Sequence, residues 1–124
     1  MRQEDKELLL KDLCARLPYG VKIQVPYEDG SGYFDETVWE VNNEGPFYVN
    51  GWGIEYEYVK PYLFPLSSMT EEQKKEYQYI TERWMYDSSY SISDSTDWLN
   101  KNHFDYRGLI PMGLAIDATG LNIY

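Results

Sequence analysis

The chain has 124 residues, 43% of them apolar and 17% aromatic, and its formal net charge is −10. This length corresponds to one domain, the single cysteine Cys14 excludes a disulfide scaffold, and the longest aliphatic run, Leu8 to Leu10, is far shorter than the ~20 residues that cross a bilayer. We therefore expect a single domain over residues 1–124 that resides in the cytoplasm and does not bind membranes.

The first segment, residues 1–19, is predicted to form a helix. Leucines recur at i, i+4 and i+8, which is the spacing of one helical face. They are Leu9, Leu13 and Leu17. Cys14 lies alongside this face, where we expect a small buried thiol. Pro18 and Gly20 then end the helical pattern.

The next segment, residues 20–66, shows the two-residue period of β-strands. Its first predicted strand alternates β-branched and polar residues over 21–25. A cluster of turn residues at 28–32 precedes a second predicted strand, residues 33–42. In that strand Trp39 and Val41 are expected to share one face.

An Asn50–Gly51 pair gives the strongest local turn signal, because a type I′ hairpin needs positive φ at both central positions. The alternating residues 54–58 are predicted to form the strand after this turn. Pro61 and Pro65 then bracket a linker or a short edge strand. Four or five short antiparallel strands predict a small SH3-like β-barrel or a bent sheet.

The remaining segment, residues 67–124, is predicted to be mainly helical. Thr70 and Gln73 form a capping-box pattern that starts a helix running to about Tyr86, and a shorter helix is expected over 96–103. The tail keeps enough aliphatic residues to be ordered and partly buried. The predicted fold class is α+β, with the C-terminal helices packed on the β region.

Three segments of the chain resemble a family of small uncharacterised proteins from bacterial, prophage and phage genomes. They are LLKDLCARLPYGVK, VKPYLFPLSSMT and LNKNHFDYRGLIPMGLAIDATGLNIY. The resemblance implies an SH3- or Sm-like small barrel followed by helices, and a phage or mobile-element context with an accessory role. It implies no activity, ligand or catalytic residue.

Residues that could carry catalysis are few and scattered. Cys14 and His103 are the only residues of their kinds and lie on different predicted helices, so neither a Cys–His dyad nor a zinc site is expected. His103 is expected to pack or to cap a helix. Asp35–Glu36 is one carboxylate pair. A second group, expected to form turns and a helix cap, comprises Asp87, Asp94 and Asp97. We predict a protein that is not an enzyme and needs no cofactor or metal.

Aromatic residues are the most distinctive feature of the composition, with 13 tyrosines and four tryptophans. Two interpretations stay open for those in the hairpins: they fill the core of a small β domain, or they form a surface that binds a protein. The candidate binding surface comprises Trp39, Tyr48, Trp52, Tyr56 and Tyr58.

Acidic residues are concentrated in the β region, where residues 18–66 hold two Lys/Arg and eight Asp/Glu, a net charge of −6. This charge disfavours direct binding of nucleic acid. The preferred hypothesis is a non-enzymatic protein-interaction module, or an accessory or regulatory factor, with a protein partner or a second copy. The alternatives are an acidic nucleic-acid mimic that inhibits a DNA-binding protein, and a small hydrolase that uses Asp35 and Glu36.

Overall fold

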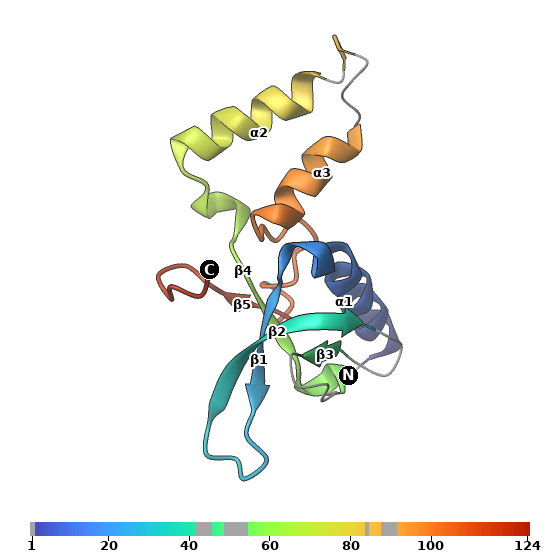
Figure 1. Ribbon diagram of the computed structural model, residues 1–124, viewed down its shortest axis with the longest axis vertical. Coiled ribbons are helices and arrows are strands. Elements are labelled where there is room, and N and C mark those ends of the chain that lie inside the picture. The colour runs from blue at the N-terminus through green and yellow to red at the C-terminus, as the bar shows by residue number, and fades with distance from the viewer. Residues whose placement is uncertain (1, 42–45, 49–54, 84, 88–91) are drawn as a thin grey trace.

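The computed structural model describes residues 2–41, 46–48, 55–83, 85–87 and 92–124, and at 46–48 and 92 it describes the backbone alone. Over these residues the chain forms an N-terminal helix, an open mixed sheet and two further helices (Figure 1). The predicted α+β class is therefore confirmed.

Helix α1 spans Gln3–Arg16, where the leucine spacing predicted a helix. Leu9 and Leu13 are fully buried and pack in the main core. A short 3₁₀ turn, Leu17–Tyr19, follows and ends at Gly20, whose φ of 73° places it in the left-handed region that glycine adopts without a steric cost. Cys14 is exposed, so the predicted buried thiol is wrong. The reason is geometric, because the next residue on a helix is turned about 100° from its neighbour.

The sheet has five strands in the order β3-β2-β1-β4-β5. They are β1 Lys22–Pro26, β2 Tyr33–Val41, β3 Pro46–Tyr48, β4 Lys60–Leu63 and β5 Ile116–Asp117. β1 pairs in antiparallel fashion with both β2 and β4, and β5 pairs in parallel with β4. The two strands predicted near 21–25 and 33–42 are thus confirmed, and so is the turn between them.

Two forms were predicted for the β region, a small SH3-like barrel and a bent sheet, and the SH3-like barrel is not confirmed. In the described part of the chain the outer strands β3 and β5 do not pair with each other, and the sheet stays open. Closure would need β4 to return to β3, but the outer side of β4 is taken by β5, which comes from the distant tail. The strands were predicted to be antiparallel throughout, and this is wrong for one pair, because β4 and β5 are parallel.

Two local predictions around β4 are wrong. Residues Tyr56–Tyr58 form a 3₁₀ turn, where a strand was predicted over 54–58. The Pro61 segment is an inner strand, because β1 and β5 flank β4, and not a linker or an edge strand. Proline is tolerated there because the pairing with β5 begins one residue later, at Tyr62. The Asn50–Gly51 turn lies outside the described residues.

Helices α2, Glu71–Arg83, and α3, Ile92–Lys101, follow the sheet. The capping box predicted at the start of α2 is confirmed: Thr70 N–H donates to Gln73 Oε1 at 2.9 Å, and Gln73 N–H donates to Thr70 Oγ1 at 3.1 Å. α3 begins four residues earlier than predicted, at Ile92. It ends before His103, whose φ is 62°.

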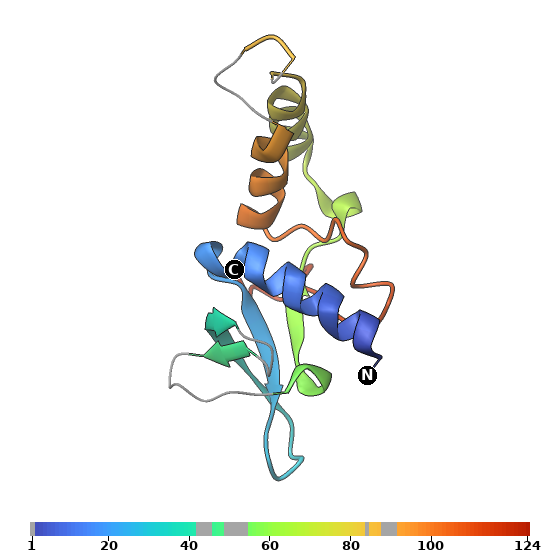
Figure 2. The ribbon, with the colours of Figure 1, turned by 90° about the vertical axis from the view of Figure 1, so that its right-hand side faces the viewer.

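The buried residues form two clusters. The larger one lies between α1 and one face of the sheet and includes Val21, Ile23, Val38 and Leu63 (Figure 2). The smaller one is built on Trp98, Leu99 and Phe104, where α2 and α3 pack together. These helices therefore extend beyond the end of β4 and do not lie on a face of the sheet (Figure 1), which corrects the predicted packing.

The tail after α3 returns to the sheet and is partly buried, as predicted. Leu109 is fully buried in the main core, and Ala115 and Ala118 are buried nearby in the chain. The carboxylate of Asp105 organises this return by accepting the N–H groups of Leu109 and Ile110 at 2.8 and 2.9 Å. None of the helices described is both long and apolar enough to cross a membrane.

Candidate functional site

The predicted aromatic surface divides between core and surface. Tyr56 is 2% exposed and belongs to the main core, so its assignment to a binding surface is wrong. Trp39 and Tyr58, with 54% and 56% exposed, are on the surface as the binding hypothesis requires. Tyr48 lies in β3, where the structure describes the backbone alone, and Trp52 lies outside the described residues.

Trp39 lies at a β-bulge in β2. Val38 pairs with Tyr48 and Glu40 pairs with Phe47, so Trp39 is the extra residue of β2 at this bulge. The bulge changes the alternation of side chains: Val38 is buried and Val41 packs on the core, whereas Trp39 lies on the surface. The prediction that Trp39 and Val41 share a face is therefore wrong, because it assumed an unbroken two-residue period.

The 3₁₀ turn explains why Tyr56 and Tyr58 separate. Residues two apart in a strand share a face, but in a 3₁₀ helix of three residues per turn they point about 120° away from each other. The buried Tyr56 ring is approached by the ammonium of Lys6, 5.9 Å from the ring centroid. Burial, and to a smaller extent the nearby Cys14 thiol, raises the pKa of Tyr56 to about 12.

Asp35 and Glu36 do not form a common carboxylate site. Consecutive residues of β2 point to opposite faces of the sheet, and Asp35 lies opposite Gln24 while Glu36 lies opposite the buried Ile23. On the outer face the hydroxyl of Tyr62 donates to Asp35, and Gln24 Nε2 donates to the same hydroxyl at 3.2 Å. Burial and the bond to Asp35 raise the pKa of Tyr62 to about 12.

The second carboxylate group is also dispersed. Asp87 pairs with Arg83 at 3.5 Å, and Asp94 lies in the first turn of α3. Asp97 is exposed on the same helix. Among the described residues, no group of three or more His, Cys, Asp or Glu side chains is arranged to hold a metal ion.

His103 is buried but does not meet the thiol of Cys14. Its imidazole stacks on the ring of Tyr124, with centroids 3.6 Å apart and planes at 10°, while Cys14 lies near Tyr56. Burial, and to a smaller extent the charges of Arg16 and Lys22, lower the pKa of His103 to about 4. The imidazole is therefore neutral near pH 7, in keeping with the packing role expected from the sequence.

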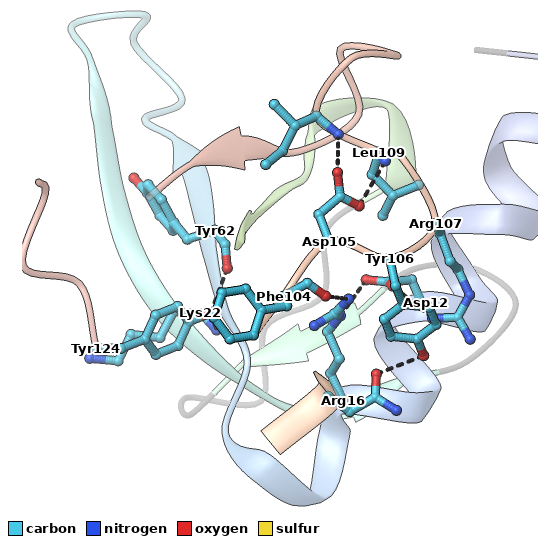
Figure 3. Close-up of polar contacts among 12 residues, drawn as sticks. Asp12, Arg16, Lys22, Tyr62, Phe104, Asp105, Tyr106, Arg107, Leu109 and Tyr124 are labelled. Carbon is cyan, nitrogen blue, oxygen red and sulfur yellow. Dashed lines mark hydrogen bonds and ion pairs between the residues drawn. The ribbon is translucent and has the colours of Figure 1, made fainter. Parts of the chain in front are cut away.

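The hydroxyl of Tyr124 connects two strands (Figure 3). It accepts the backbone N–H of Lys22 in β1 at 2.9 Å and donates to the backbone carbonyl of Tyr62 in β4 at 2.8 Å. The ammonium of Lys22 also donates to the carbonyl of Ile123 at 2.8 Å. No pattern in the sequence predicts this arrangement, because Lys22 and Tyr124 are 102 positions apart.

A buried ionic cluster, also missed from the sequence, joins α1 to the tail (Figure 3). Arg16, fully buried, donates to Asp12 Oδ2 at 2.8 Å and to the carbonyl of Phe104 at 2.6 Å. Arg107 donates to the other oxygen of Asp12 at 2.8 Å, and its guanidinium lies 4.5 Å from the ring centroid of Tyr106. The i,i+4 spacing of Asp12 and Arg16 is visible in the sequence, but their burial is not.

Comparisons of the chain with known protein families, curated proteins and solved structures found no match. The resemblance to small bacterial and phage proteins stays a prediction.

Proposed function

We propose that the chain is a non-enzymatic protein-interaction module whose main contact is Trp39. The observation that carries the proposal is the 54% exposure of this indole. An exposed tryptophan offers a large apolar area with one hydrogen-bond donor, and tryptophan is enriched among the residues that dominate binding energy at protein interfaces. Trp39 lies within strand β2, so the backbone that carries it is ordered before a partner covers it.

The charge of β2 favours a basic partner segment. The strand carries three acidic residues, Asp35, Glu36 and Glu40, and no lysine or arginine. Glu40 is exposed directly after Trp39. A lysine or arginine side chain can stack on an indole face and pair with a neighbouring carboxylate, so both groups favour the same partner chemistry.

The dispersed chemistry supports a non-enzymatic role. The Asp35–Glu36 pair is split between the two faces of β2, and Cys14 and His103 have different neighbours. In line with the sequence-based expectations, we propose that the module acts in the cytoplasm, as an accessory or regulatory factor of a phage or mobile element.

Quantitative capture from a native lysate tests this proposal. The wild-type chain, Trp39→Ala and Tyr86→Ala serve as baits. The last is a matched control, because Tyr86 is 82% exposed and lies in the turn after α2. We expect one partner to be retained by the wild type and by Tyr86→Ala, and its Kd to rise at least about 30-fold in Trp39→Ala, as for an interface hot spot.

Two results would contradict the proposal. One is a partner that binds Trp39→Ala as tightly as it binds the wild type. The other is the absence of any retained partner together with a monomer in native mass spectrometry, which also removes binding to a second copy.

A further inference from the structure

The hydroxyl of Tyr124 takes the place of a backbone hydrogen bond within the sheet. β1 and β4 pair at Ile23 and Pro61, and the next pair along this register is Lys22 with Tyr62. There the N–H of Lys22 donates to the phenol oxygen, and the phenol donates to the carbonyl of Tyr62. Both the acceptor and the donor capacity of the hydroxyl are therefore used by backbone groups of two strands.

The ring of Tyr124, a residue that is 42% exposed, is bordered by side chains from separate parts of the chain. The imidazole of His103 stacks on it at 3.6 Å, and the ring of Phe64 lies at 6.0 Å and 54°. The ammonium of Lys22 is 6.0 Å from its centroid. This surrounding is selective for a phenol, because a phenylalanine would fill the same space and leave the N–H of Lys22 and the carbonyl of Tyr62 without this partner.

The segment that carries Tyr124 is held by this side chain and by the ammonium of Lys22, which donates to the carbonyl of Ile123 at 2.8 Å. Residues 119–122 are exposed, and the N–H groups of Thr119 and Leu121 bond within their own turn. Exposed segments with few contacts open at a low free energy, so Tyr124 can leave its place without global unfolding.

We propose that Lys22, Tyr62, Phe64 and His103 form a tyrosine-binding slot, which Tyr124 occupies as an internal ligand and which a tyrosine side chain of a partner protein occupies when Tyr124 is displaced. The slot has two aromatic walls for the ring and one donor and one acceptor for the hydroxyl. It uses no group of the Trp39 contact, so the two proposals can fail separately.

The Tyr124→Ala variant empties the slot for a direct binding test. N-acetyltyrosinamide is the probe, and N-acetylphenylalaninamide, which lacks only the hydroxyl, is the matched control. We expect the tyrosine probe to raise the Tm of Tyr124→Ala by about 4 °C at ten times its Kd, and the phenylalanine probe to bind about tenfold more weakly. The wild type should bind the tyrosine probe at least about tenfold more weakly than the variant, because its own Tyr124 competes at a high effective concentration.

A second variant tests the walls of the slot. Tyr124→Ala combined with His103→Asn removes the stacked ring, and asparagine tolerates the left-handed backbone of position 103. This chain should bind both probes more weakly, because the imidazole stacks on the aromatic ring, which the two probes share. A folded Tyr124→Ala that binds the two probes equally, or a wild type that binds the tyrosine probe as tightly as the variant, would overturn the proposal.

Tyr124→Phe decides the question if Tyr124→Ala does not fold. This variant keeps the ring and removes only the hydroxyl, so we expect hydrogen exchange of the Lys22 amide to accelerate at least about tenfold while amides of α2 are unchanged. An unchanged exchange rate at Lys22 would show that the hydroxyl does not hold β1 and β4 together, and the slot would be refuted.

Discussion

At the scale of single residues, the most demanding group is the guanidinium of Arg16. Arg16 and Asp12 are both fully buried and contact each other. Arg16 also donates to the carbonyl of Phe104, and Asp12 also accepts from Arg107, two residues that lie far along the chain. A buried ion pair contributes little net stability relative to apolar residues, but removal of one partner leaves an uncompensated buried charge.

Arg16→Met is therefore expected to lower the free energy of unfolding by about 3–5 kcal/mol, because Asp12 loses one of its two cationic partners inside the core. Urea unfolding at pH 7 measures this. Arg2→Ala is the control, because the side chains of Arg2 and Glu4 are 73% and 84% exposed and such a pair contributes little. Similar losses in the two variants would contradict the burial of the cluster.

His103 makes stability depend on pH in a defined direction. Its pKa is lowered from 6.5 to about 4 in the folded state, so the unfolded chain takes up the proton first as the pH falls. The contribution of the neutral imidazole is complete above pH 6.5 and is lost as the pH falls from about 6.5 to 4, at a cost of about 3 kcal/mol.

The His103→Asn variant isolates this contribution from the carboxylates that titrate in the same range. The difference in unfolding free energy between the wild type and the variant should decline over pH 6.5 to 4, measured by urea denaturation at several pH values. A difference that is constant with pH would mean that His103 titrates normally in the fold.

At the scale of elements, local sequence signals and tertiary pairing each account for part of the fold. α1, β1, β2 and α2 appear where period and capping predict them. The exceptions are the bulge at Trp39, the 3₁₀ turn at Tyr56–Tyr58 and the inner position of β4. In each of these places the partner strand or the core, and not the local pattern, decides the conformation.

The capping box of α2 gives a prediction at this scale. Thr70→Ala removes the acceptor of the Gln73 N–H and should lower the free energy of unfolding by about 1 kcal/mol, measured by thermal or urea denaturation. Thr70→Ser keeps the hydroxyl and should retain most of the stability. An equal loss in both variants would assign the effect to packing of the threonine methyl group.

At the scale of the whole molecule, contacts between distant segments explain what the sequence could not predict. Arg107 reaches Asp12 across 95 positions, and Tyr124 reaches Tyr62 and Lys22 across 62 and 102 positions. Contacts between distant residues produce no periodic pattern of apolar residues in the sequence, and a strand of two residues such as β5 is too short to show one. The tail was therefore predicted to be buried from its composition, but its place at the edge of the sheet was not.

The candidate site was predicted only in part, for the same physical reason. An abundance of aromatic residues in the β region pointed to recognition, and Trp39 and Tyr58 are on the surface. Composition could not show that Tyr56 is buried while Tyr58 is exposed, because this difference depends on the 3₁₀ turn, and the alternating sequence of the segment predicts a strand instead. The tyrosine slot had no sequence signal, since its groups come from β1, from β4 and the residue that follows it, and from His103 after α3.

The most direct test of the central proposal follows the indole N–H of Trp39 by NMR while the captured partner is added. We expect this resonance to shift and become protected from solvent on binding, while the indole N–H of Trp98, which is buried in the second cluster, does not move. A complex that forms with the Trp39 resonance unchanged would contradict the assignment of Trp39 as the contact.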